Sequence, residues 1–150
     1  DDRLHLDGMS QTIVGRYNAQ AVLDIVRYGS SSRGLYPVRI EAKGQAVIIE
    51  FNGYCSQLAF DTVRVNKVKN YGFQVITHHN KDIAKSVSLV DNCVVIECCE
   101  ETKGCKVRYG GNGERNKSGR RLGARGNLVG YHAAALPSWC YMFSEVATEK

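Results

Sequence analysis

Residues 36–51 read YPVRIEAKGQAVIIEF, and this stretch predicts the first two strands of a β-rich fold. Residues 36–41 alternate apolar and polar side chains around Pro37, and a proline suits the start of a strand. Residues 45–51 are rich in Val and Ile, which favour extended backbone. We therefore expect sheet structure to begin here.

Further β-type runs follow along the chain. Asn52-Gly53 is a turn signal that separates the second predicted strand from the third. The remaining predicted strands cover residues 58–66, 73–79, 86–90, 93–99, 127–132 and 139–146. One amphipathic helix is predicted over residues 11–28, because apolar residues recur there at helical spacing after a plausible N-cap at Ser10. Those apolar residues are Val14, Tyr17, Ala21, Val22 and Ile25.

These elements predict an α+β fold in which a single N-terminal helix packs on one antiparallel β-sheet. The 150 residues contain no repeat and no clear boundary, so we expect one domain over residues 1–150, and a monomer. No stretch approaches the roughly 18 uninterrupted apolar residues of a membrane span, so no membrane partner is expected. The chain begins Asp-Asp-Arg, which is not a secretory signal, and we expect that such a signal has been removed.

Six cysteines favour disulfides in an oxidising compartment, because the count is even and four of them crowd between residues 93 and 105. Buried thiols that pack as small hydrophobic groups are the second interpretation. Zinc is the third, since the spacing lacks the Cys-x2-Cys pairs of tetrahedral sites, and we expect neither a metal nor a cofactor. The cysteines are Cys55, Cys93, Cys98, Cys99, Cys105 and Cys140.

Residues 103–126 form a basic, glycine-rich segment, which we expect to be a flexible loop. It holds eight basic residues against Glu114 alone, so it carries +7 in a chain of net charge +5. Such a segment can follow a phosphate backbone, with Tyr109 or Tyr131 available to stack on a base. The alternative is a solvated connection that keeps the protein soluble. The candidate RNA-binding residues are Tyr36, Lys103, Lys106, Arg108, Tyr109, Arg115, Lys117, Arg120, Arg121 and Arg125.

Glu50, Arg64 and His78 form a candidate catalytic set, because each lies in or at the end of a predicted strand. Cleavage of RNA through its own 2′-hydroxyl needs a base, an acid and a cation beside the phosphate. The alternative is that Glu50 and Arg64 are an ordinary cross-strand charge pair and that His78 faces solvent.

The order of these motifs resembles the guanyl-specific ribonucleases of fungi. The matching segments are the helix, Tyr36-Pro37, the strand that ends in Glu50 and Phe51, residues 61–66 (DTVRVN) and residues 75–78 (VITH). The resemblance implies that Tyr36 matches a tyrosine of the ribonuclease site, Glu50 the general base and His78 the general acid. Val38 stands where those enzymes have their first histidine, and Thr62 stands at their arginine position, two residues before Arg64.

A ribonuclease-like pattern with missing catalytic residues resembles the RNase-like effectors that powdery mildew fungi secrete. This resemblance covers about residues 4–95 and leaves the last 50 residues outside it. Within those, the apolar runs predict a C-terminal β extension over residues 127–146. It implies a secreted virulence protein of a plant pathogen, a pseudo-ribonuclease that acts inside a host cell. Its partner would be host RNA, the ribosome or a host protein.

Two other functions remain open from the sequence. One is an active endoribonuclease that uses Glu50, Arg64 and His78. The other is a β-rich virulence factor of unrelated fold that a host immune receptor recognises. The large C-terminal part, which lies outside the ribonuclease pattern, favours this second function.

Overall fold

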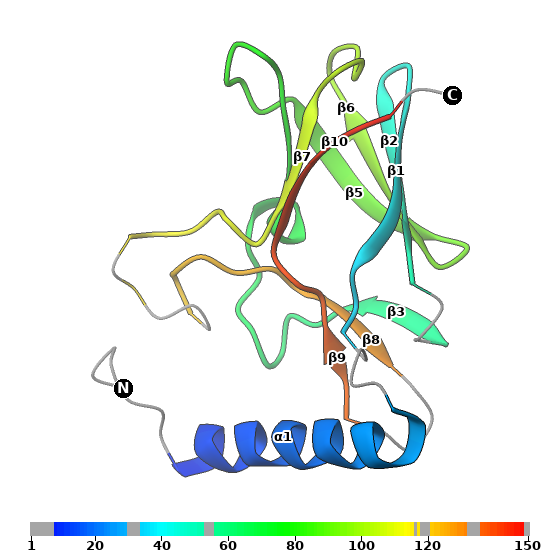
Figure 1. Ribbon diagram of the computed structural model, residues 1–150. Coiled ribbons are helices and arrows are strands. Elements are labelled where there is room, and N and C mark those ends of the chain that lie inside the picture. Colours follow the sequence, from blue (N-terminus) through cyan, green and yellow to red (C-terminus); the bar gives the residue numbers. More distant parts are fainter. Residues whose placement is uncertain are drawn as a thin grey trace.

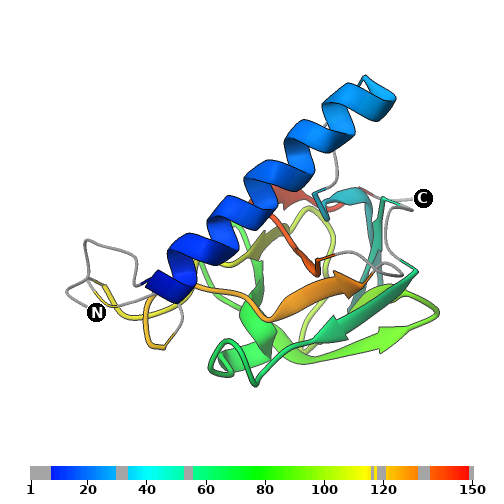
Figure 2. The ribbon, with the colours of Figure 1, turned by 90° about the horizontal axis from the view of Figure 1, so that it is seen from below.

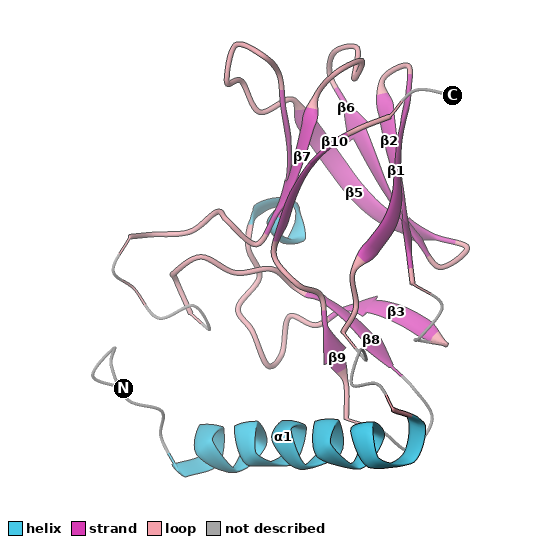
Figure 3. Cartoon of the chain, in the orientation of Figure 1, coloured by secondary structure: helices cyan, strands magenta, loops and turns pink. Residues whose placement is uncertain are grey.

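The computed structural model describes residues 8–29, 34–52, 56–115, 117, 121–131 and 136–148. It confirms the α+β class: one N-terminal helix precedes a series of antiparallel strands (Figures 1 and 3). The helix α1 spans Gly8–Tyr28, and a short 3-10 helix, η1, spans Lys69–Gly72. The strands are β1 (Pro37–Lys43), β2 (Ala46–Phe51), β3 (Gln57–Phe60), β4 (Phe73–Ile76), β5 (Ala84–Val90), β6 (Cys93–Cys98), β7 (Lys106–Tyr109), β8 (Leu128–Tyr131), β9 (Ser138–Trp139) and β10 (Phe143–Val146).

The prediction of one sheet is wrong, because the described strands form three sheets. Their orders are β1-β2-β6-β5, β10-β7-β4 and β3-β8-β9. The C-terminal strands are therefore not an extension at the edge of an N-terminal sheet. β8 pairs with β3 and β10 pairs with β7, so the last part of the chain completes two of the three sheets.

The four-stranded sheet and the β10-β7-β4 sheet face each other and meet at both edges. At one edge β4 turns directly into β5, with an antiparallel bridge between Ile76 and Asp82. At the other edge Thr148, just after β10, bridges to Glu41 of β1. The β3-β8-β9 sheet lies beneath them, between the two larger sheets and α1 (Figure 1).

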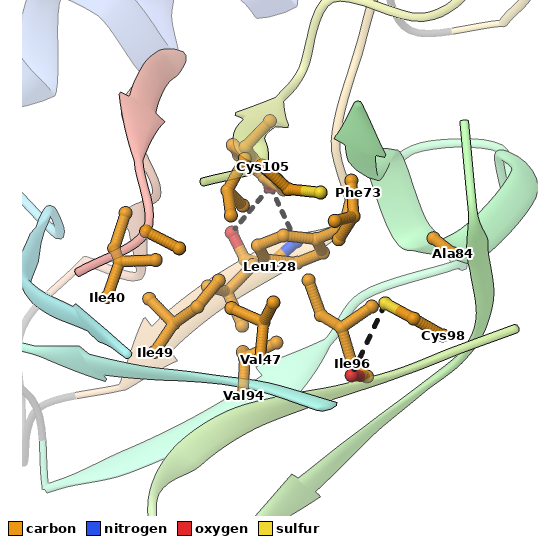
Figure 4. Close-up of a cluster of buried hydrophobic side chains, with 14 of the residues drawn as sticks. Ile40, Val47, Ile49, Phe73, Ala84, Val94, Ile96, Cys98, Cys105 and Leu128 are labelled. Carbon is orange, nitrogen blue, oxygen red and sulfur yellow. Dashed lines mark hydrogen bonds between the residues drawn. The ribbon is translucent and has the colours of Figure 1, made fainter. Parts of the chain in front are cut away.

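One hydrophobic core is shared by all three sheets (Figure 4). Val47 and Ile96 come from the four-stranded sheet, Phe73 from β4 and Leu128 from β8, and each is fully buried. The burial of apolar surface from every sheet in one cluster is the main term that holds small sheets together.

β7 lies inside the segment that the sequence predicts to be a flexible loop, so that prediction is wrong for its first third. Val107 and Tyr109 are buried, whereas Lys106 and Arg108 are exposed. This is the alternation of a strand with one buried face. Lys106 and Arg108 therefore project from β7, the central strand of the β10-β7-β4 sheet.

Two predicted strands are shorter than the sequence indicates, and both changes affect candidate site residues. β3 ends at Phe60, because the Asp61 carboxylate accepts hydrogen bonds from the backbone N–H groups of Val63 and Arg64, at 2.9 and 2.8 Å. Arg64 therefore lies in a loop. β4 ends at Ile76, which places His78 in the turn that leads to β5.

The helix begins three residues before the predicted boundary and ends as predicted, but it does not pack as predicted. Its only buried residue is Asp24, while Val14, Val22 and Ile25 are exposed. Contact with the rest of the protein includes Tyr17, whose hydroxyl donates a hydrogen bond to the carbonyl of Pro137 next to β9. No described helix is long and apolar enough to cross a membrane.

The Tyr109 hydroxyl joins β7 to β8, because the Leu128 amide donates to it at 2.8 Å in a fully buried position. Tyr109→Phe would leave that amide without a partner, and an unsatisfied buried donor costs about 1–3 kcal/mol. We expect the free energy of unfolding in urea to fall by about that amount. Tyr141→Phe removes a hydroxyl from a ring that is 58% exposed and is the matched control. Equal stability of the two variants would contradict this role of Tyr109.

Candidate functional site

The outer face of the β10-β7-β4 sheet carries a row of exposed cations. Strand register places Arg108 between Gln74 of β4 and Ser144 of β10. Lys106 lies one step further along, between Ile76 and Val146. Because alternate residues of a strand point to the same side, the two basic side chains project from one face, about 7 Å apart along the strand.

The turn after β4 closes one side of this face and forms what we call the cationic cleft. The cleft has a volume of about 250 Å³. The structure thus brings His78, a predicted catalytic residue, beside Lys106 and Arg108, which are predicted RNA-binding residues. The lining residues are Ile76, Thr77, His78, Asn80, Gly104, Lys106, Arg108 and Val146.

The cations of the cleft have no acidic partner among the described residues. Neither Lys106 nor Arg108 forms an ion pair within the described ranges. Asp82 lies on the same hairpin, but its carboxylate accepts hydrogen bonds from the backbone N–H groups of Val75 and Ala84, at 3.1 and 3.2 Å. The positive charge of Lys106 and Arg108 is therefore available to an anion.

His78 lies at the rim of the cleft with His79 as its neighbour. Their ring centroids are 3.8 Å apart and both side chains are exposed. An exposed imidazole can donate a hydrogen bond to a phosphate oxygen. Thr77 and Asn80, which also line the cleft, add a hydroxyl and an amide to the donors available there.

The other predicted RNA-binding cations differ in their surroundings. Lys103, Arg115, Lys117 and Arg121 are exposed, and Arg120 lies outside the described residues. Arg125 has a structural role, because its guanidinium donates to the backbone carbonyls of three residues. These are Asn66, Gly123 and Lys67, at 2.9, 2.7 and 3.3 Å.

The prediction that Tyr109 stacks on a base is wrong for this structure, because its ring is buried. Only 3% of Tyr109 is exposed, and the ring packs against Phe73 with centroids 4.5 Å apart. Burial also raises the pKa of its hydroxyl. Tyr131, the other predicted stacking residue, is half-buried at the end of β8 and its hydroxyl lies 3.4 Å from the Arg64 guanidinium.

Tyr36 lies apart from the cationic cleft. It is 41% exposed and lines a second groove, of about 520 Å³, between β1 and β10. That groove also contains Val38, the residue at the position of the missing histidine, and Tyr141.

The three candidate catalytic residues lie on different segments, and no described hydrogen bond or ion pair joins any two of them. Glu50 of β2 accepts a hydrogen bond from Arg39 of β1 at 3.2 Å. His78 lies in the turn between β4 and β5, whereas Arg64 lies in the loop between β3 and η1. Cleavage of RNA would require the base, the acid and the phosphate-binding cation to reach one scissile phosphate. The described contacts do not bring these three residues together.

Arg64 serves the loop in which it lies. Its guanidinium donates to the Asp61 carboxylate at 2.6 Å. Burial acts to raise the pKa of Asp61, but hydrogen bonds from the backbone and side chain of Arg64 and from the backbone of Val63 outweigh it and lower that pKa. The Asp61–Arg64 pair therefore stabilises the turn that ends β3.

No group of three His, Cys, Asp or Glu side chains in the described part of the chain is placed to hold a metal ion. The comparisons with protein-family models, with curated proteins and with solved structures found no match to this chain.

The five described cysteines are free thiols, and Cys55 lies outside the described residues. Cys98 and Cys105 are buried, as expected from the second interpretation of the sequence, in which thiols pack as small hydrophobic groups. Burial, together with Cys105 and Cys99, raises the pKa of the Cys98 thiol to about 12, and burial raises that of Cys140 as well. Cys99 is exposed.

These thiols should differ in reactivity, since the thiolate is the nucleophile and a raised pKa lowers its population. In the native protein near pH 8 we expect Cys99 to react rapidly with a disulfide reagent such as DTNB. Cys98, Cys105 and Cys140 should react only after unfolding in guanidinium. Cys99→Ser should remove one rapidly reacting equivalent. Rapid reaction of Cys98, Cys105 or Cys140 in the native protein would contradict this assignment. So would a failure of these three thiols to react after unfolding.

Proposed function

We propose that this protein is a non-catalytic, RNA-binding effector domain, which holds the sugar–phosphate backbone of single-stranded RNA against the cationic cleft. One observation carries the proposal: Lys106 and Arg108 project side by side from β7, next to His78, and have no acidic partner among the described residues. A phosphate backbone is the ligand that such a row of cations and hydrogen-bond donors fits.

The composition of the cleft supports backbone binding without base recognition. No Phe, Tyr or Trp is among its described lining residues, and Tyr109 is buried beneath it. Proteins that read RNA sequence usually stack bases on exposed aromatic rings. Binding at this face should therefore depend strongly on salt and weakly on sequence.

The effector assignment rests on the resemblance to RNase-like effectors, with Val38 in place of a catalytic histidine. The separation of Glu50, Arg64 and His78 supports a binding role over an enzymatic one, because each has a different neighbour. The exposed cations of the glycine-rich segment, such as Arg115 and Arg121, would extend the electrostatic attraction beyond the cleft.

Removal of the two cleft charges should weaken RNA binding. For Lys106→Gln with Arg108→Gln we expect a loss of affinity for a labelled oligo(U) of at least tenfold at low salt, measured by fluorescence anisotropy. Each lost phosphate contact should reduce the slope of log K against log salt by about 0.7. Lys85→Gln, which removes a charge from exposed β5, is the control and should change affinity little.

A second variant separates the cleft from the exposed cations Arg115 and Arg121. Arg115→Gln with Arg121→Gln should weaken binding less than the cleft variant does, because these residues are not part of the cleft. If wild-type protein fails to bind RNA at low salt, the proposed function is wrong. If the cleft variant binds as wild type does, the binding face is elsewhere.

We also expect that the wild-type protein does not cleave RNA, so the Glu50→Gln substitution should have no activity to abolish. Glu50 forms an ion pair with Arg39, and neither Arg64 nor His78 is joined to it by a described contact. Incubation of labelled RNA with wild-type and Glu50→Gln protein, followed by a denaturing gel, should give intact RNA in both. Cleavage by wild type alone would establish the endoribonuclease instead.

A further inference from the structure

The helix α1 turns a polar side toward the protein. Asp24 is 1% exposed, and its carboxylate accepts a hydrogen bond from Gln20 Nε2 at 2.9 Å. Tyr17, two turns before Asp24, donates a hydrogen bond from its hydroxyl to the Pro137 carbonyl. These positions follow helical spacing, so they form one continuous side. The side of α1 that faces the protein therefore carries the polar groups of Tyr17, Gln20 and Asp24.

The remainder of the helix surface is mainly apolar and exposed. Figure 2 shows α1 lying across the outside of the molecule, with the three sheets behind it. The largest exposed fractions are 77% at Val26 and 72% at Met9. A surface helix of a soluble domain normally shows the opposite arrangement, with its apolar stripe toward the core. The large apolar residues on this remaining surface are Met9, Val14, Val22, Leu23, Ile25, Val26 and Tyr28. Ile13, 43% exposed, lies seven residues before Gln20 and so shares the side of Asp24.

The exposed charge of the helix is entirely positive. Its charged residues are Arg16, Asp24 and Arg27, and Asp24 is buried. Arg16 and Arg27 are eleven residues apart, or about three turns, so they lie on the same side of the helix. Leu23 lies between them on that side, at the border of the apolar surface. A long basic side chain at such a border can place its head group in the polar layer above a lipid.

We propose that α1 lies flat on an anionic lipid surface, with its apolar side in the boundary between head groups and acyl chains. The helix has 21 residues and is about 31 Å long. Interfacial helices bind through buried apolar area and through attraction between basic side chains and anionic lipids, and α1 offers both. Such a helix lies along the surface and does not cross the lipid, so it needs no span of about 18 uninterrupted apolar residues.

Charge also argues against a second copy of the chain as the occupant of this face. Antiparallel pairing of two α1 helices about Val22 would bring Arg16 of one copy close to Arg27 of the other. The only acid of the helix, Asp24, faces inward and cannot compensate. Like charges at such positions destabilise a helix pair, whereas an anionic surface attracts them.

The test is flotation of the full-length protein with phosphatidylcholine vesicles and with vesicles that contain phosphatidylserine. We expect binding to the anionic vesicles that weakens with added salt. Val22→Asp with Val26→Asp should reduce binding at least tenfold, since both residues are more than half exposed and the fold should persist. Val63→Asp, at a loop residue that is 92% exposed, is the matched control and should bind as wild type does.

Charge variants separate the helix from the cationic cleft. Arg16→Gln with Arg27→Gln should lower the preference for anionic vesicles, and Lys106→Gln with Arg108→Gln should lower it less. Vesicle binding that survives Val22→Asp with Val26→Asp but is lost in the cleft variant would overturn the proposal. So would a concentration-dependent dimer, measured by sedimentation, that the same helix variant dissociates. RNA affinity should be unchanged in the helix variants, so the two proposals fail independently.

Discussion

The aromatic row Phe73–Tyr109–Phe143 is the constraint on which the candidate site depends. Register aligns one ring from each strand of the β10-β7-β4 sheet, and the ring centroids lie 4.5 Å apart for Phe73 and Tyr109 and 5.7 Å apart for Tyr109 and Phe143. Because neighbouring residues of a strand face opposite sides, burial of Tyr109 forces Arg108 to the outside. A one-residue slip of β7 would bury the cations and expose the ring, so the core that stabilises the sheet also orients the charges.

This arrangement places the cations on rigid backbone. Tyr109 is held by the Leu128 amide, and its ring lies so close to Gly126 that any Cβ there would meet it at 2.1 Å. Asn127, between these two residues, is fully buried, and its side-chain amide donates to the carbonyls of Asp61 and Val65, at 2.9 and 3.0 Å. The chain after the basic segment is thus fixed beneath β7. Cations on an ordered strand lose less conformational entropy on binding a phosphate than cations on a free loop.

The parts of the fold that the sequence predicts well are those with long apolar runs. β2 and β6 agree with prediction to within one residue, because their Val and Ile residues are buried between neighbouring strands. The sequence does not predict β7, since only Val107 and Tyr109 mark it within a charged, glycine-rich segment, and their burial comes from strands distant in sequence. For the same reason the meeting of His78 with Lys106 could not be predicted: it depends on the pairing of β4 with β7. The β-like run over residues 58–66 predicts Arg64 in a strand, but the hydrogen bonds that Asp61 accepts interrupt that run.

The helix shows a different limit of sequence reasoning. Periodicity establishes which residues share a side, but it does not establish which side the protein covers. The natural expectation is that Val22 and Ile25 face the core, and in this structure they do not. Val26 is 77% exposed, and a valine left in water gains no free energy from burial. An apolar environment on the outer side of the helix would supply that gain. The lipid proposal therefore follows from the energetics of the helix itself, independently of what the cationic cleft binds.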